Sequence, residues 1–223
     1  MMIVVVALVG ILCGLVLNPI ITRIATDPKA ANPMLAPRYA MLGYPSWLGI
    51  VVVALSAIMA VVLYRVYGLT WRGVYWFIVS LVLIVTGTVD WKVRLIDGLI
   101  LLVALIFSLA AASSVGIGFK NALLGTLIGG IVFILFFILA RFMFPGEGVP
   151  FGLGDVYLAM YIGAAVGLRH LGASLFYGIL MAGLVSIGML AVRQMGRDIP
   201  MYLSYGTYLC LGVLLYVALW SPL

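Results

Sequence analysis

Long apolar runs constrain this sequence more than any other feature. A helix of roughly 17–25 apolar residues crosses about 30 Å of hydrocarbon, and no run shows the ten-residue alternation of a membrane strand. The chain is therefore predicted to be an all-α polytopic membrane protein with about eight transmembrane helices. Charged residues, prolines and glycines divide it into the runs 2–22, 47–64, 72–89, 98–116, 121–143, 155–168, 172–192 and 202–220.

The composition supports a lipid environment. Of the 223 residues, 66% are hydrophobic and only 8% are charged, which is too little polar surface to cover a soluble globule. We expect residues 1–223 to form a single transmembrane domain in contact with the lipid bilayer. The one long polar connection, 23–46, contains four prolines and is predicted to be a short surface loop.

Basic residues divide unequally between the two sides of the predicted bundle. Connections between eight successive spans alternate in side, and one side receives eight Lys and Arg residues against four on the other. The positive-inside rule makes the first side cytoplasmic, which predicts a multi-pass cell-membrane protein with the 23–46 loop in the cytoplasm. The basic residues are scattered along the chain rather than clustered, which argues against nucleic-acid binding despite the net charge of +6. The two sets are Arg23, Lys29, Arg38, Lys92, Arg94, Arg141, Arg193 and Arg197, and Arg65, Arg72, Lys120 and Arg169.

The acidic residues are fewer than the basic ones and more informative about function. All six fall on the predicted cytoplasmic side, which indicates a chemical site on that face. Two of them border apolar runs, Asp90 at the end of the third and Asp155 at the start of the sixth. An ionisable group at a membrane boundary is costly to keep there and is a candidate functional residue. The six are Asp27, Asp90, Asp97, Glu147, Asp155 and Asp198.

Asp90 and Asp155 can act as a pair if the third and sixth spans pack together. Two neighbouring carboxyls share one proton, so that one activates water while the other polarises a carbonyl group. This is the chemistry of an aspartic peptidase, and it requires neither a metal nor a cofactor. Cys13 and Cys210 lie in separate apolar runs, and the sequence shows no metal-ligand spacing.

Gly152 and Gly154 precede the second aspartate in a Gly-Leu-Gly-Asp sequence. Without Cβ atoms they permit a sharp turn and the close approach of a substrate strand or a neighbouring helix. Taken alone, Asp155 is explained equally well as a helix N-cap, and an aspartate placed like Asp90 is more often a solvated loop residue. The functional hypothesis depends on the two aspartates together.

Several segments of the chain resemble the type IV prepilin peptidases, a family of Gly-x-Gly-Asp intramembrane aspartic peptidases that includes archaeal preflagellin peptidases. Residues 14–23 are similar to the end of the family's first span, where Gly, Asn and Arg recur at this spacing. Residues 90–96 resemble the first catalytic segment, and residues 146–159 resemble the second, with a Glu before the Gly-x-Gly-Asp. The resemblance implies that Asp90 and Asp155 are the catalytic residues.

The same resemblance implies a substrate. It is a prepilin-like or preflagellin-like (archaellin-like) protein whose short basic leader is removed after a glycine on the cytoplasmic side. Asp97, Glu147 and Asp198 are expected to attract basic leader residues, and Arg94 is a further candidate for substrate contact.

The chain departs from the family pattern at several positions, and one of these departures bears on its expected activity. Many bacterial members carry paired Cys-x-x-Cys motifs in the first cytoplasmic loop, associated with N-methylation of the cleaved pilin, whereas 23–46 contains no cysteine. N-methyltransferase activity is therefore expected to be absent. Asp97 and Gly98 stand where bacterial members usually have Pro and then Asn or Asp, and Tyr157 replaces a common Lys.

Two other functions remain open from the sequence. A small membrane transporter or channel could use the aspartates to bind ions or relay protons, but would favour acids near the membrane centre and inverted repeats. A non-catalytic assembly scaffold would be expected to lose one aspartate of the pair.

Overall fold

The fold is a bundle of helices. The computed structural model describes residues 2–26, 46–143, 152–195 and 203–219, and within these ranges eight helices and no strand occur. The predicted all-α class is confirmed. The helices are α1 (Met2–Thr26), α3 (Ser46–Tyr67), α4 (Trp71–Val93), α5 (Gly98–Ala111), α6 (Phe119–Met143), α7 (Leu153–Val166), α8 (Leu168–Gln194) and α9 (Tyr205–Leu219).

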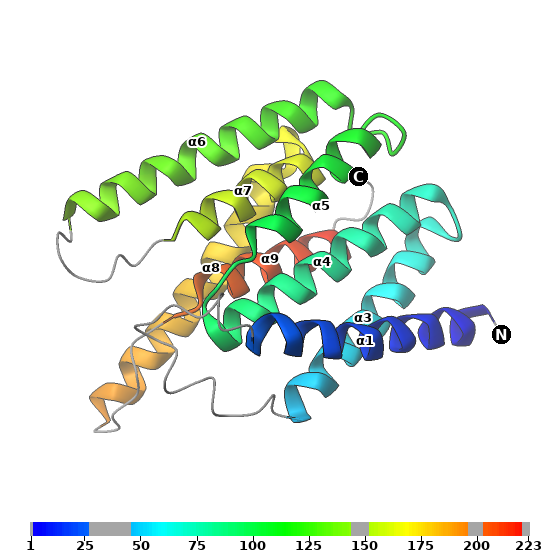
Figure 1. Cartoon of the computed structure of the whole chain (residues 1–223), viewed down its shortest axis with the longest axis horizontal. Helices are drawn as coiled ribbons and strands as arrows, with labels where there is room; N and C mark the ends of the chain where they lie inside the picture. Colours follow the sequence, from blue (N-terminus) through cyan, green and yellow to red (C-terminus); the bar gives the residue numbers. More distant parts are fainter. Residues whose placement is uncertain (1, 27–45, 144–151, 196–202, 220–223) are drawn as a thin grey trace.

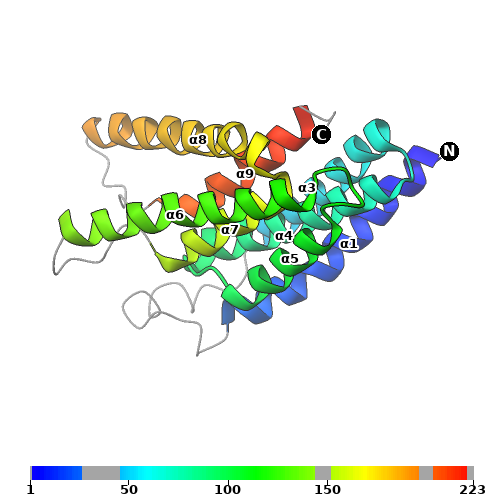
Figure 2. The ribbon, with the colours of Figure 1, turned by 90° about the horizontal axis from the view of Figure 1, so that it is seen from above.

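Successive helices run in opposite directions, so their ends alternate between the two ends of the molecule (Figure 1). Viewed from above, α8 and α1 lie on opposite sides, with α4 and α7 between them (Figure 2). The tightest pairs are α1 with α3, α6 with α7, and α8 with α9, while α9 also packs along α4. The central helices α4, α7 and α9 carry the longest series of buried residues.

Within the described residues, five helices are long and apolar enough to cross a membrane, namely α1, α3, α4, α6 and α8. The chain is thus a multi-pass membrane protein. The predicted number of spans is only partly confirmed, because α5, α7 and α9 have 14, 14 and 15 residues. At 1.5 Å per residue these cover about 21–23 Å, less than the roughly 30 Å of hydrocarbon.

The apolar runs did not fix the helix ends. The run 98–116 stops being helical after Ala111 and continues as turns, and α7 ends where Gly167 adopts a φ of 75°. At the predicted 23–46 loop, helix α1 continues to Thr26 and α3 already begins at Ser46. The rest of that loop lies outside the described residues.

Glycines allow close packing between neighbouring helices. A Cβ atom built on Gly129 of α6 would lie 2.6 Å from the Ala159 carbonyl oxygen of α7, and one on Gly178 of α8 would lie 2.8 Å from the Leu209 Cα of α9. Real Cβ atoms do not approach other atoms this closely. These helices therefore pack backbone against backbone, as small residues permit in membrane bundles.

Two tyrosine side chains fix how α7 lies against α4. The Tyr75 hydroxyl donates a hydrogen bond to the Ala165 carbonyl at 3.0 Å, and the Tyr161 hydroxyl donates one to the Val79 carbonyl at 3.5 Å. These bonds join the start of α4 to the end of α7, so the two helices are antiparallel. The end of α4 and the start of α7 consequently share one end of the bundle, and α9 also begins there (Figure 1).

Candidate active site

Asp90 lies in the last turn of α4 and is buried, with 6% of its surface exposed. The helix continues past the predicted end at residue 89 and closes at Arg94, whose N–H donates to the Asp90 carbonyl at 2.8 Å. Arg94 adopts a left-handed conformation with a φ of 53°. Asp90 is therefore a helical residue inside the bundle rather than a solvated loop residue.

The Asp90 carboxyl is held by the start of another helix. Oδ2 accepts hydrogen bonds from the backbone N–H of Thr207 at 2.7 Å and from the Thr207 hydroxyl at 3.0 Å. Thr207 is the third residue of α9, and N–H groups in the first turn of a helix have no partner within that helix. Asp90 thus satisfies one of these donors at the positive end of the α9 dipole.

Two glycines allow α9 to come this close to α4. A Cβ atom built on Gly206 would lie 3.0 Å from Asp90 Oδ2 and 2.9 Å from Ile96 Cδ1. One built on Gly87 would lie 3.1 Å from Cys210 Cβ. A side chain at position 206 would push directly against the Asp90 carboxyl.

Asp155 is the third residue of α7 and is also buried, with 8% of its surface exposed. Its Oδ2 accepts a hydrogen bond from the Gly152 N–H at 3.1 Å, and its own N–H donates to the Gly152 carbonyl at 3.1 Å. Asp155 is therefore not the N-cap of α7, which is Gly152; it accepts the N–H of the N-cap residue from the third helical position. A Cβ atom on Gly154 would lie 2.7 Å from Ile96 Cβ, whereas one on Gly152 would meet nothing closer than 3.8 Å.

The structure brings the two aspartates together. Ile96, in the link between α4 and α5, packs both against Gly206, next to the Asp90 carboxyl, and against Gly154, next to Asp155. The two carboxyls are close enough to interact electrostatically. Two carboxyls that come close to each other can share one proton and then titrate as a pair.

The other predicted site residues have different positions. Arg94 closes α4 and lies within electrostatic reach of Asp90. Asp97 is the N-cap of α5, and its Oδ1 accepts bonds from the N–H groups of Leu99 at 2.8 Å and Ile100 at 3.4 Å. Glu147 and Asp198 lie outside the described residues.

Thr207 is the functional candidate that sequence reasoning missed. It is 117 positions away from Asp90, and a threonine near the start of the last apolar run carries no motif. The close approach that Gly206 permits could have suggested a contact at this point, but not its partner.

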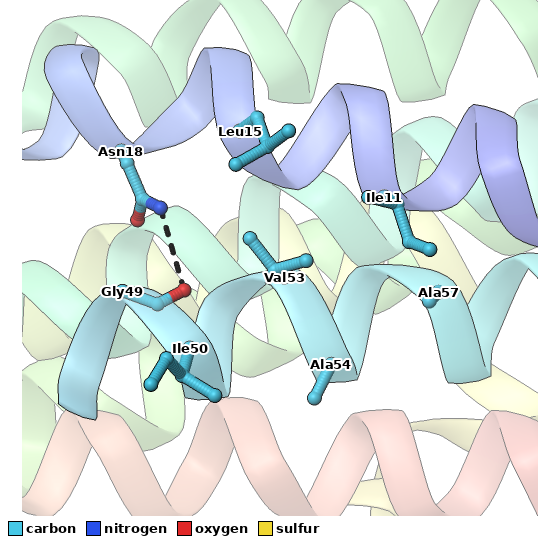
Figure 3. A pocket seen from close by; sticks show the side chains of 8 residues that line it. All are labelled: Ile11, Leu15, Asn18, Gly49, Ile50, Val53, Ala54 and Ala57. Atoms are coloured by element: carbon cyan, nitrogen blue, oxygen red, sulfur yellow. Dashed lines mark hydrogen bonds between the residues drawn. The ribbon is translucent and has the colours of Figure 1, made fainter. Parts of the chain in front are cut away.

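One cavity reaches Thr207, and a second lies between α1 and α3. A mostly apolar cavity of about 160 Å³ between α3, α4 and α9 reaches Gly87 and Thr207. A larger groove of about 600 Å³ lies between α1 and α3, where the Asn18 side chain donates to the Gly49 carbonyl at 3.3 Å (Figure 3). Neither aspartate lines this larger groove, and its other lining residues are apolar or glycine.

No metal site was found in the part of the chain that the structure describes, where no three His, Cys, Asp or Glu side chains come together.

Comparison with known proteins identifies the family of this chain. The model of the type IV leader peptidase family matches residues 77–187, about half of the chain, and both aspartates lie inside the match. Searches of curated proteins and of solved structures gave no match. The match confirms the resemblance seen in the sequence: this chain is a membrane-bound member of the type IV leader peptidase family.

Proposed function

We propose that this protein is an aspartic endopeptidase that removes the short basic leader from prepilin-like or archaellin-like substrates. The observation that carries the proposal is the pair of buried carboxyls, Asp90 and Asp155, at one end of the bundle. The family supplies the reaction class, since its members are leader peptidases.

The proposed mechanism uses the proton that the pair shares. One carboxylate accepts a proton from a water molecule, whose oxygen attacks the carbonyl carbon of the scissile bond. The other aspartate, protonated, donates a hydrogen bond to the carbonyl oxygen as negative charge develops there. Return of a proton to the leaving nitrogen releases the leader, and the pair again holds one proton.

The proposed orientation places the aspartate end of the bundle in the cytoplasm, with the protein in the cell membrane. Helices α1, α4, α6 and α8 end there, and the connections that start from α1 and α8 add Lys29, Arg38 and Arg197 in the sequence. Together with the five described cations this gives the excess that the positive-inside rule assigns to the cytoplasm. The five are Arg23, Lys92, Arg94, Arg141 and Arg193.

The short helices suggest where the site lies in the membrane. Helices α5, α7 and α9 all begin at the aspartate end, and α6 and α8 extend beyond the starts of α7 and α9 (Figures 1 and 2). We infer that the short helices complete eight spans and begin below the membrane surface. The recessed site would meet the apolar helix of the substrate while the leader reaches the cytoplasm.

Substrate contacts follow from this orientation. We propose that Glu147, Asp198 and Asp97 attract basic leader residues and that Arg94 helps to place the substrate near Asp90. The apolar cavity beside Thr207 suits an apolar side chain of the substrate. The cysteine-free segment 23–46 supports cleavage without N-methylation, so the product should keep a free amino terminus.

The test is cleavage of a prepilin-like substrate by the purified protein in liposomes. Asp90→Asn and Asp155→Asn should each lower the cleavage rate by at least the 10²–10⁴-fold that general acid–base groups contribute. His170→Gln, at the opposite end of the bundle beside Tyr216, is the matched control and should cleave normally. Full activity in either aspartate variant would refute the proposal, and ion flux without cleavage by the wild-type protein would favour a transporter.

A further inference from the structure

The Thr207 hydroxyl lies between two hydrogen-bond acceptors. Its oxygen is 3.0 Å from Asp90 Oδ2 on one side and 2.9 Å from the Gly87 carbonyl oxygen on the other. A hydroxyl has one proton to donate and two lone pairs that accept. If Asp90 is ionised, both neighbours are acceptors, and the hydroxyl can donate to only one of them at a time.

The backbone of Thr207 holds the carboxyl in place independently of the hydroxyl. The Thr207 N–H donates to the same Oδ2 at 2.7 Å, and this N–H is fixed in the first turn of α9. Rotation of the hydroxyl proton therefore leaves the position of the Asp90 carboxyl unchanged.

We propose that Thr207 is a positioning residue whose hydroxyl reorients with the protonation state of Asp90, an inference that rests on the proposed peptidase function. With Asp90 ionised, the hydroxyl donates to Oδ2. With Asp90 protonated on Oδ2, the carboxyl donates to the Thr207 oxygen, and the hydroxyl donates to the Gly87 carbonyl. A carbonyl oxygen has two lone pairs, so Gly87 can accept this bond as well as its helical one.

Other groups near Asp90 do not provide this exchange. Arg94 on α4 is a cation that can only donate, Asp155 on α7 is the second acid of the pair, and Cys210 on α9 carries a thiol that donates and accepts weakly. The bond that the structure shows on Asp155 comes from the Gly152 backbone, which can donate but not accept. Thr207 thus gives Asp90 a hydrogen-bond partner in both of the states that the catalytic cycle requires.

Three variants test the inference in the liposome cleavage assay. Thr207→Val removes the hydroxyl at nearly constant volume and should lower kcat about tenfold or more, with a smaller change in KM, because a bond to a charged group is lost. Thr207→Ser keeps the hydroxyl and should stay within about threefold of the wild type. Thr126→Val is the control, since this buried threonine donates to the Ala122 carbonyl within its own helix α6.

The outcomes separate this inference from the function on which it rests. A kcat for Thr207→Val within about threefold of the wild type would overturn the inference, as would equal losses in the Val and Ser variants. Normal cleavage by Asp90→Asn would instead refute the peptidase proposal. If Thr207→Val does not fold, as judged by thermal unfolding in detergent, Thr207→Cys replaces it and should also lower kcat, because a thiol is a weak donor.

Discussion

Asp90 and Asp155 occupy the same end of the bundle but are held in different ways. Asp155 is positioned locally, by a bond to the Gly152 backbone three residues earlier in the chain. Asp90 is positioned by Thr207, which reaches it from a helix 117 positions later. One half of the site is therefore built into a single helix start, while the other half depends on the contact between α4 and α9.

Among substitutions that keep both aspartates, the largest expected effect is at this distant contact. In Gly206→Ala, the new Cβ atom would lie within 3.0 Å of Asp90 Oδ2 and of Ile96 Cδ1, so the carboxyl or the start of α9 must move. Displacing a catalytic group by about 1 Å can cost about 100-fold in rate. We expect kcat/KM for leader cleavage to fall by about that factor while the protein still accumulates in the membrane.

Gly172→Ala is the matched control for this substitution. Gly172 lies within α8, and a Cβ atom there would meet nothing within 4 Å. Its activity should equal that of the wild type. If Gly206→Ala also cleaves at the wild-type rate, then the position of Asp90 does not depend on its contact with α9.

The half of the site that contains Asp155 can be tested by substituting Gly152 and Gly154 of the Gly-x-Gly-Asp sequence. In Gly154→Ala, the added methyl group would lie 2.7 Å from Ile96 Cβ, and overpacking of this kind typically costs about 1–3 kcal/mol. In Gly152→Ala, the nearest atoms are 3.8 Å away, and φ is −96°. Thermal unfolding in detergent should therefore show destabilisation for position 154 and little change for position 152.

The reverse order of stabilities would contradict the packing described around Ile96. Loss of cleavage without loss of stability in Gly152→Ala would have a separate meaning. It would show that Gly152 is needed for the approach of the substrate rather than for the fold.

The same contrast separates what sequence could predict from what it could not. Eight apolar runs predicted eight helices, because hydrophobic length is a local property. Alternation of sides was enough to place Asp90 and Asp155 at one end. The Gly-x-Gly-Asp sequence was informative because Asp155 and its capping glycine are neighbours in the chain.

The remaining features depend on tertiary contacts. Thr207 was missed because nothing in one sequence pairs it with Asp90. The short lengths of α5 and α9 were missed because apolar residues continue past the helix ends. The left-handed conformation of Arg94 has no signal either, since non-glycine residues rarely adopt it.

Asp97 lies in the segment that joins α4 to α5, and two substitutions separate its capping role from a role in substrate binding. Its carboxylate caps α5 through Leu99 and Ile100, so Asp97→Ala should destabilise the protein by about 1 kcal/mol. Asp97→Asn keeps an oxygen that can cap but removes the charge. If Asp97 also attracts the basic leader, the Asn variant should raise KM several-fold at unchanged stability, and an unchanged KM would limit Asp97 to capping.

Arg94→Gly is expected to have the smallest effect on stability and separates two roles of this residue. Glycine adopts the φ of 53° without a steric cost that L-residues pay, so the free energy of unfolding should rise by up to about 1 kcal/mol. The substitution also removes a cation within electrostatic reach of Asp90. Unchanged leader cleavage together with higher stability would show that Arg94 only ends α4. Weaker cleavage with higher stability would show that the left-handed turn keeps an arginine, at a cost in stability, for its charge beside Asp90.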